Sequence, residues 1–165
     1  IIGPNAIAGE WGHNPLPWPA ENESPGPRCY CGKRGCIETF LSGPGLARDH
    51  AMINQGDLTA EAIATHAEES DERALNTIAR YEERMARALA SVINVIDPNV
   101  IVLGGGCSKI GRLYRNVPRL WNRYVFSDEI TTELRPNVHG DSSGVRGAAW
   151  LWPSKQSRSA ASQYS

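Results

Sequence analysis

CYCGKRGCIE (residues 29–38), with GEWGH (residues 9–13) upstream of it, is the stretch of this chain that decides how it folds. The two segments contain one histidine and three cysteines: His13, Cys29, Cys31 and Cys36. Three thiolates and one imidazole complete the tetrahedral shell of a structural zinc ion and leave no open position for a metal-bound water. Gly32 and Gly35 allow tight turns between these ligands. The pattern therefore predicts a closed, structural zinc site.

Two other states of the cysteines remain open from the residues alone: a disulfide among them, or free reduced thiols. A bridge between Cys29 and Cys31 would close a very small and strained ring. The chain shows no basic start, apolar core and small-residue cleavage site, so no secretory signal is recognised. Clustered cysteines beside a histidine, in a chain without export signals, favour a metal over disulfides.

The segment between the histidine and the first cysteine also needs a stabilising interaction to be ordered. Residues 14–19 (NPLPWP) cannot form a helix, because proline removes an N–H donor and biases the preceding residue toward an extended conformation. Residues 21–28 are predicted to be an exposed loop. Long loops without secondary structure are uncommon in compact domains. Zinc binding contributes about 10–16 kcal/mol in small peptides, and a similar contribution would order this loop.

Two carboxylates flank the predicted ligands. Glu10 lies three residues before His13, and Glu38 lies two residues after Cys36. Paired carboxylates held in this way accept hydrogen bonds from the neighbouring hydroxyls of a sugar. The residues alone leave two alternatives open: solvated surface groups, or carboxylates that orient the metal ligands.

Composition limits the class of protein. The 165-residue chain is 41% hydrophobic and 21% charged, which suits one globular domain with a substantial core. Its net charge of −1 predicts no general binding to nucleic acid or to an anionic membrane, and no apolar run reaches membrane-spanning length. We expect a cytoplasmic protein. Because the chain opens on Ile1, we expect a processed product or the later part of a longer protein.

Periodicity, caps and turn residues predict an α/β fold. The longest helix is expected to begin after Ser70 or Asp71 and to end at Asp97-Pro98, because its apolar residues recur at steps of three and four. The run 100–103 is apolar and β-branched, which suits a strand buried on both faces of a parallel or mixed sheet. The remaining expectations are a more exposed strand at 131–138, helices at 36–41, 46–54, 59–68, 110–124 and 143–152, and disorder at 154–165.

Gly104, Gly105 and Gly106 follow the predicted strand and precede a predicted helix. Glycines let the backbone approach a phosphate, and a helix N-terminus supplies oriented N–H groups. The run lacks the spacing of a P-loop or a dinucleotide fingerprint, so a simple tight turn is the alternative. Cys107 is interpreted as a small core residue. Four arginines on the following helix are interpreted as a solvated face rather than a nucleic-acid site: Arg112, Arg115, Arg119 and Arg123.

Four segments in order along the chain carry a family resemblance: GEWGH, CYCGKRGCIE with the following SG, VIVLGGG, and SSGVRGAA. This ordered signature resembles the ROK family of sugar kinases and repressors, and it runs from about Ala8 to Trp152. The histidine-and-three-cysteine motif is its most specific part. The run GEWGHNPLPWP is similar to the fructokinase or manno(fructo)kinase branch of that family.

The resemblance implies the C-terminal lobe of a ribonuclease H-like, actin-like ATPase fold over residues 1–152. The zinc-binding segment would cover residues 9–38, and residues 153–165 would form a disordered tail. The family's N-terminal lobe, which carries a phosphate-binding motif and the general-base aspartate, is expected upstream of Ile1. No catalytic residue is therefore assigned in this chain, and the chain alone is expected to be inactive.

The resemblance also assigns roles to the site residues. Glu10 and Glu38 would hydrogen-bond sugar hydroxyls, while His13 would bind zinc with one ring nitrogen and contact the sugar with the other. Cys29, Cys31 and Cys36 would complete the metal site, and Gly104 to Gly106 would border the nucleotide. The implied reaction transfers the γ-phosphoryl group of Mg-ATP to a hexose, with fructose expected first and mannose next, in a homodimer without membrane or nucleic-acid partners. The alternative is the sugar-sensing domain of a ROK repressor.

Overall fold

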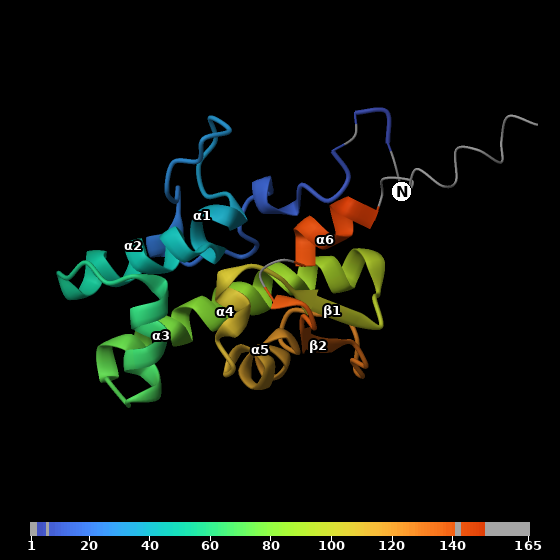
Figure 1. Cartoon of the computed structure of the whole chain (residues 1–165). Coiled ribbons are helices and arrows are strands. Elements are labelled where there is room, and N and C mark those ends of the chain that lie inside the picture. The colour runs from blue at the N-terminus through green and yellow to red at the C-terminus, as the bar shows by residue number, and fades with distance from the viewer. Residues whose placement is uncertain (1–2, 6, 141–142, 151–165) are drawn as a thin grey trace, which may run out of the picture.

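Helix α4 (Glu72–Ile96) is the central element of the structure, which is a computed structural model describing residues 3–5, 7–140 and 143–150 (Figure 1). The Asp71 side chain caps it by accepting a 2.7 Å hydrogen bond from the Ala74 N–H. Asp97 ends it in a left-handed conformation at φ 49°, directly before Pro98. Both predicted boundaries of the longest helix are confirmed.

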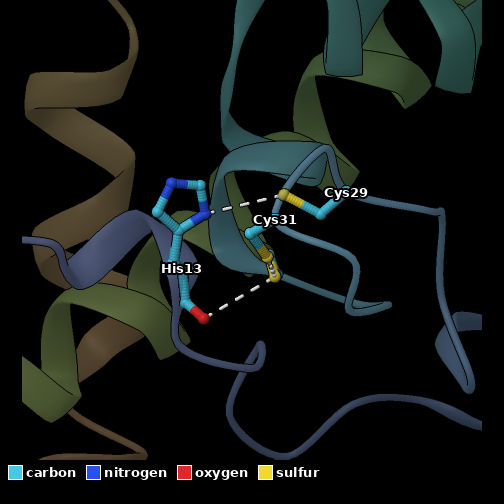
Figure 2. A group of neighbouring side chains, drawn as sticks. His13, Cys29 and Cys31 are labelled. Carbon is cyan, nitrogen blue, oxygen red and sulfur yellow. Dashed lines mark hydrogen bonds between the residues drawn. The ribbon is translucent and has the colours of Figure 1, made fainter.

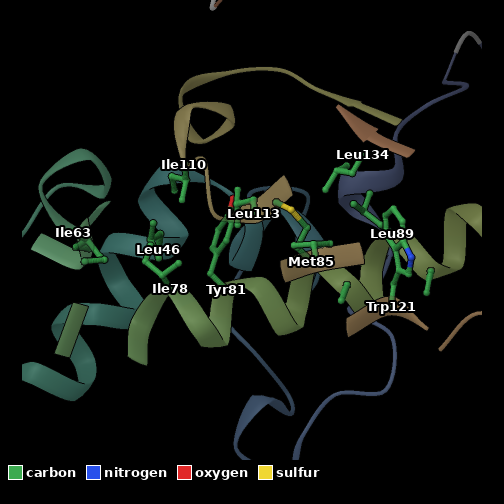
Figure 3. Packing of buried hydrophobic residues seen from close by; sticks show 14 of the residues in the cluster. Leu46, Ile63, Ile78, Tyr81, Met85, Leu89, Ile110, Leu113, Trp121 and Leu134 are labelled. Carbon is green, nitrogen blue, oxygen red and sulfur yellow. The ribbon is translucent and has the colours of Figure 1, made fainter. Parts of the chain in front are cut away.

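Four further helices pack around α4: α1 (Ile37–Leu41), α2 (Gly43–Asn54), α3 (Ala60–Glu68) and α5 (Leu113–Trp121). The Thr59 side chain caps α3 by accepting from the Ala62 N–H at 3.1 Å, as its position in the sequence predicts. The core between these helices contains fully buried large side chains, among them Ile63, Ile78, Tyr81, Leu113 and Trp121 (Figure 3).

The sheet consists of β1 (Val100–Leu103) and β2 (Glu133–Pro136), which pair in parallel with Val100 opposite Glu133. Both strands were predicted, and their parallel pairing agrees with the expected parallel or mixed sheet, but burial of β1 on both faces is wrong. Ile101 and Leu103 pack against the core, whereas Val100 and Val102 are 45% and 57% exposed. Among the described residues no layer covers that second face, so the apolar run has one core-facing side.

The predicted start of the second helix differs from the structure. Helix α2 begins at Gly43 rather than Leu46, because the Ser42 side chain accepts from the Gly45 N–H at 3.1 Å and caps the helix there. Pro44 lies in this first turn, where its missing N–H has no partner to lose.

The glycine run is not followed directly by a long helix. A short 3₁₀ turn, η3 (Gly106–Lys109), comes first, and α5 covers only Leu113–Trp121. Hydrogen bonds hold η3 in place: the Tyr114 hydroxyl donates to the Ser108 carbonyl at 2.6 Å, and the Asn137 amide donates to the Ser108 hydroxyl at 3.0 Å. The helix predicted at 110–124 is therefore shorter at both ends, and the glycine run leads into a 3₁₀ turn and not into the N-terminus of an α-helix.

The chain ends, within the described part, on α6 (Ser143–Trp150). The last two residues of the predicted helix 143–152 and the predicted tail 153–165 lie outside the described residues. Trp150 is 90% exposed. No helix in the described part of the chain is both long and apolar enough to cross a membrane.

Candidate metal centre

The four predicted ligands come from three local structures. His13 closes the short 3₁₀ helix η1 (Trp11–His13), and Cys29 and Cys31 lie in the tight turn that the Gly32 N–H closes on the Cys29 carbonyl at 3.1 Å. Cys36 is the residue before α1. An isolated antiparallel bridge between Pro15 and Cys36 brings the histidine segment beside the last cysteine.

The ligand atoms of His13, Cys29, Cys31 and Cys36 all lie within 4.8 Å of one another. The Cys31 and Cys36 sulfurs are 3.6 Å apart, and His13 Nδ1 lies 3.5 Å from the Cys29 sulfur (Figure 2). A tetrahedral zinc ion with bonds of about 2.3 Å to sulfur places its ligand atoms about 3.8 Å apart. These distances match that shell, so the four side chains fit a metal ion, and zinc itself stays a prediction.

The two ring nitrogens of His13 have different neighbours. Its Nδ1 faces the sulfurs, while its Nε2 lies 2.8 Å from the Tyr30 hydroxyl and 3.9 Å from a Glu10 carboxylate oxygen. The Tyr30 ring also packs edge-on against the imidazole, with the ring centroids 5.0 Å apart. Sequence reasoning missed Tyr30, although its place between two ligand cysteines was a signal that could have found it.

Both predicted carboxylates lie beside the histidine. Glu38 Oε2 is 3.7 Å from His13 Nδ1, and the Glu10 and Glu38 side chains are 65% and 45% exposed. Gly12 lies close to Glu38, since a Cβ at this position would be 3.4 Å from the Glu38 Cβ. The structure thus places two accessible acceptors around one ring, next to the cysteines.

The thiols differ in acidity. A hydrogen bond from the Lys33 backbone lowers the pKa of Cys31 to about 7, whereas burial raises the pKa of Cys36 to about 11. Metal ligation requires thiolates, so loading this site would release protons, including the one on the buried Cys36 thiol.

A mostly apolar groove of about 1,100 Å³ borders both the carboxylate site and the glycine run. Its lining includes Glu10 and Trp11 as well as Gly104. Gly105 and Gly106 do not line this groove, and Gly106 borders a separate pocket of about 380 Å³. A Cβ on any of the three glycines would meet nothing within 4 Å, so crowding within the described residues does not require glycine there.

A buried ion-pair network next to the metal centre was not anticipated. Glu23 was predicted to lie in an exposed loop, and Arg84 and Arg87 lie off the apolar stripe of α4, yet all three side chains are at most 8% exposed. Glu23 accepts from Arg84 Nε at 2.6 Å and from Arg87 Nη2 at 2.8 Å. The network ties the proline-rich segment to the central helix.

Comparison with known proteins identifies the family. The model of the ROK family matches residues 1–155. The chain belongs to the ROK family. An N-acetyl-D-glucosamine kinase of Yersinia pseudotuberculosis is 32% identical to this ROK chain over 155 residues, which are 92% of the chain and 51% of the relative. One from Vibrio parahaemolyticus is 37% identical, over 90% of the chain and 51% of the relative. The chain thus spans about half the length of the curated relatives it matches.

Solved ROK structures share the fold. A ROK hexokinase from Thermus thermophilus superposes with a TM-score of 0.75 at 28% identity, covering 92% of this chain and 49% of that one. A ROK glucokinase from Streptomyces griseus, in complex with glucose and AMPPNP, gives 0.75 at 23% identity over 88% of this chain and 51% of that one. These sugar kinases have the actin-like ATPase fold, which confirms the predicted fold family.

Proposed function

We propose that this chain is the sugar- and zinc-binding part of an ATP-dependent hexose kinase. The single observation that carries the proposal is the arrangement around His13: the ring lies in a cluster with three cysteine sulfurs, and Glu10 and Glu38 lie within 3.9 Å of it. Membership of a family whose similar relatives are named as sugar kinases supports the same reading.

Each group has a distinct task in this proposal. Glu10 and Glu38 accept hydrogen bonds from adjacent sugar hydroxyls, which ionised carboxylates do strongly. His13 offers Nε2 to a sugar hydroxyl, which would take the place of the Tyr30 hydroxyl on that nitrogen, while the metal shell sets the position of the ring. A zinc ion bound by four protein ligands has no open position, so its contribution is to hold the loop in shape.

The nucleotide is proposed to lie where the glycine run borders the groove. Gly104 lines the same groove as Glu10, and the glycine run leaves open space around its backbone. We propose that the Gly104–Gly106 backbone borders the ATP phosphates and that the general base is contributed from outside this chain. Phosphoryl transfer depends mainly on positioning and charge stabilisation, so this chain alone is proposed to be inactive.

Two sugars compete as the substrate. The run GEWGHNPLPWP, similar to the fructokinase branch, favours D-fructose. The relatives named N-acetyl-D-glucosamine kinase make that sugar the first competitor. We propose D-fructose, with D-mannose as a further substrate, in a homodimer.

Coupled ADP release by the whole protein that contains this chain, and by this chain alone, tests the proposal. The whole protein should turn over D-fructose, and this chain alone should not. Turnover by the chain alone would contradict the assignment of the base, and turnover of N-acetyl-D-glucosamine in preference to fructose would correct the specificity. Absence of turnover by the whole protein with every hexose tested would refute the proposed kinase activity.

Substitution of the carboxylates tests the site itself. Glu10→Gln and Glu38→Gln should weaken sugar binding by about tenfold each, a loss of about 1.4 kcal/mol, while zinc content stays unchanged. Glu61→Gln, on an exposed helix surface, is the matched control. Loss of zinc in either site variant would place the carboxylates in a metal-orienting role instead.

A sugar-sensing repressor domain is the second candidate. A ROK family transcriptional regulator has this fold, with a TM-score of 0.61 at 22% identity over 71% of this chain and 33% of that one. A DNA-binding segment in the sequence that precedes Ile1 in the whole protein would favour this candidate over the kinase.

A further inference from the structure

A separate pocket borders the cysteine loop, which we define as residues 28–36. This arginine pocket, of about 460 Å³, is lined by residues 22–28, by Arg34 and by parts of α1, α2 and α4. In Figure 1 the loop is the blue segment that stands over α1 and α2. The lining includes four arginines: Arg28, Arg34, Arg48 and Arg84. None of them belongs to the carboxylate site around His13.

The pocket has a surplus of positive charge. Its two carboxylates, Glu23 and Asp49, are both already bonded to Arg84, at 2.6 and 2.7 Å. Asp49 also pairs with Arg80 on α4. Within the described residues, Arg28 and Arg34 form no ion pair and Arg48 donates to the Thr39 carbonyl, so three guanidinium groups have no carboxylate partner.

Two of these arginines face each other directly. Arg28 and Arg34 form an isolated antiparallel bridge, flanked by the bonds Cys29 N–H to Lys33 O at 2.8 Å and Gly35 N–H to Pro27 O at 2.9 Å. This pattern defines a non-hydrogen-bonded pair, whose Cα atoms lie about 4.5 Å apart. Like charges directly opposite each other destabilise such a pair. An anion between the two guanidinium groups would reverse that effect.

The backbone segments next to this arginine pair are tightly packed against each other. Gly26 has φ +74°, and a Cβ there would lie 2.6 Å from the Gly35 Cα. The Arg84 side chain, 8% exposed, forms the floor with its guanidinium group over the Phe40 ring, 5.2 Å from the centroid. The backbone that carries Arg28 and Arg34 is therefore closely packed, although both arginine side chains are exposed.

We propose that the arginine pocket binds the phosphate group of a small molecule. Guanidinium groups bind phosphate oxygens in bidentate fashion, and three arginines without a carboxylate partner line this pocket. A volume of about 460 Å³ has room for a phosphorylated sugar as well as for free phosphate. Because residues 28–36 contain two of the lining arginines and three of the metal ligands, an anion bound here stabilises the loop that holds His13.

Calorimetric titration of the zinc-loaded chain with inorganic phosphate and with a hexose 6-phosphate tests the proposal. Both should bind, with affinities that fall as salt rises. Tighter binding of the hexose phosphate would identify a phosphorylated sugar as the ligand, and equal binding would identify free phosphate. The titrations are repeated in the Glu10→Gln background, so that failure of the proposed sugar site does not affect the result.

Substitutions of the lining arginines test whether phosphate binds in the arginine pocket. The double variant Arg28→Ala/Arg34→Ala should lose at least tenfold in phosphate affinity, and Arg48→Ala, which lies outside the cysteine loop, should lose about tenfold. Lys33→Ala is the matched control, since this lysine is in the same loop but does not line the pocket. Absence of saturable phosphate binding, or equal binding by Arg48→Ala and the native chain, would overturn the proposal.

Discussion

Replacement of Glu23 by alanine is the sharpest test of how the loop that carries the metal ligands is held. The Glu23 carboxylate is 7% exposed and accepts from Arg84 and Arg87, as well as from the Ala20 N–H at 2.8 Å. No metal takes part in these contacts. They form a second anchor for the proline-rich segment, independent of the cysteines.

The expected loss of stability depends on which hydrogen-bond partners each arginine keeps in the Glu23→Ala variant. Arg84 keeps Asp49 at 2.7 Å, but Arg87, 6% exposed, keeps only the carbonyls of Pro17 and Trp18 and no carboxylate among the described residues. Breaking a buried pair in this way is destabilising by about 3–5 kcal/mol. We expect about 3 kcal/mol because one of the two arginines remains paired. For a chain of this size the melting temperature should fall by about 6–12 °C.

Thermal unfolding followed by circular dichroism on the zinc-loaded chain measures the effect. Glu21→Ala, in the same 3₁₀ turn but exposed, is the matched control and should change stability by less than about 0.5 kcal/mol. If Glu23→Ala and Glu21→Ala melt within 2 °C of each other, where about 6 °C or more is expected, the buried network does not hold the loop and the reasoning fails.

The same carboxylate predicts a pH dependence. Burial by itself would raise the pKa of Glu23, but hydrogen bonds from Arg84, the Ala20 N–H and Arg87 outweigh it and hold the pKa below its ordinary value of 4.5. A carboxyl with a lowered pKa in the folded state stabilises the fold above its unfolded pKa, and loses that contribution as the pH falls through the folded pKa. The difference between native and Glu23→Ala melting temperatures should therefore shrink below about pH 4.

Two further predictions concern the cysteine loop. Chelation of zinc should lower the melting temperature and make residues 14–28 susceptible to protease, and a metal-free chain that melts and resists cleavage like the zinc-loaded one would show that the metal is not structural. Gly26→Ala should destabilise the fold by at least 2 kcal/mol more than Gly32→Ala, because both have positive φ but only at Gly26 would the Cβ overlap backbone, at 2.6 Å from the Gly35 Cα. Equal urea midpoints for these two variants would contradict that reading.

Local sequence signals were sufficient for most of the secondary structure. Asp71 and Thr59 cap helices by hydrogen bonds to residues three positions away, so their role is visible without tertiary contacts. The limits of α4 and the position of β1 follow in the same way. Predictions failed where a neighbour decided the outcome: β1 has one covered face, and the segment after Gly106 is shaped by contacts of Ser108 with Tyr114 and Asn137.

In the metal centre, too, the sequence predicted some features and the tertiary structure decided others. Residue type and spacing alone singled out His13 and the three cysteines, because tetrahedral ligation restricts which side chains can serve and how they turn around the ion. The sequence did not reveal which nitrogen of His13 faces the sulfurs, the bond from its other nitrogen to Tyr30, or the burial of Glu23 against arginines 61 and 64 positions further on. Helical periodicity predicts that a charged residue off the apolar stripe is exposed to solvent. Only the tertiary structure shows when a distant segment packs over that residue and buries it.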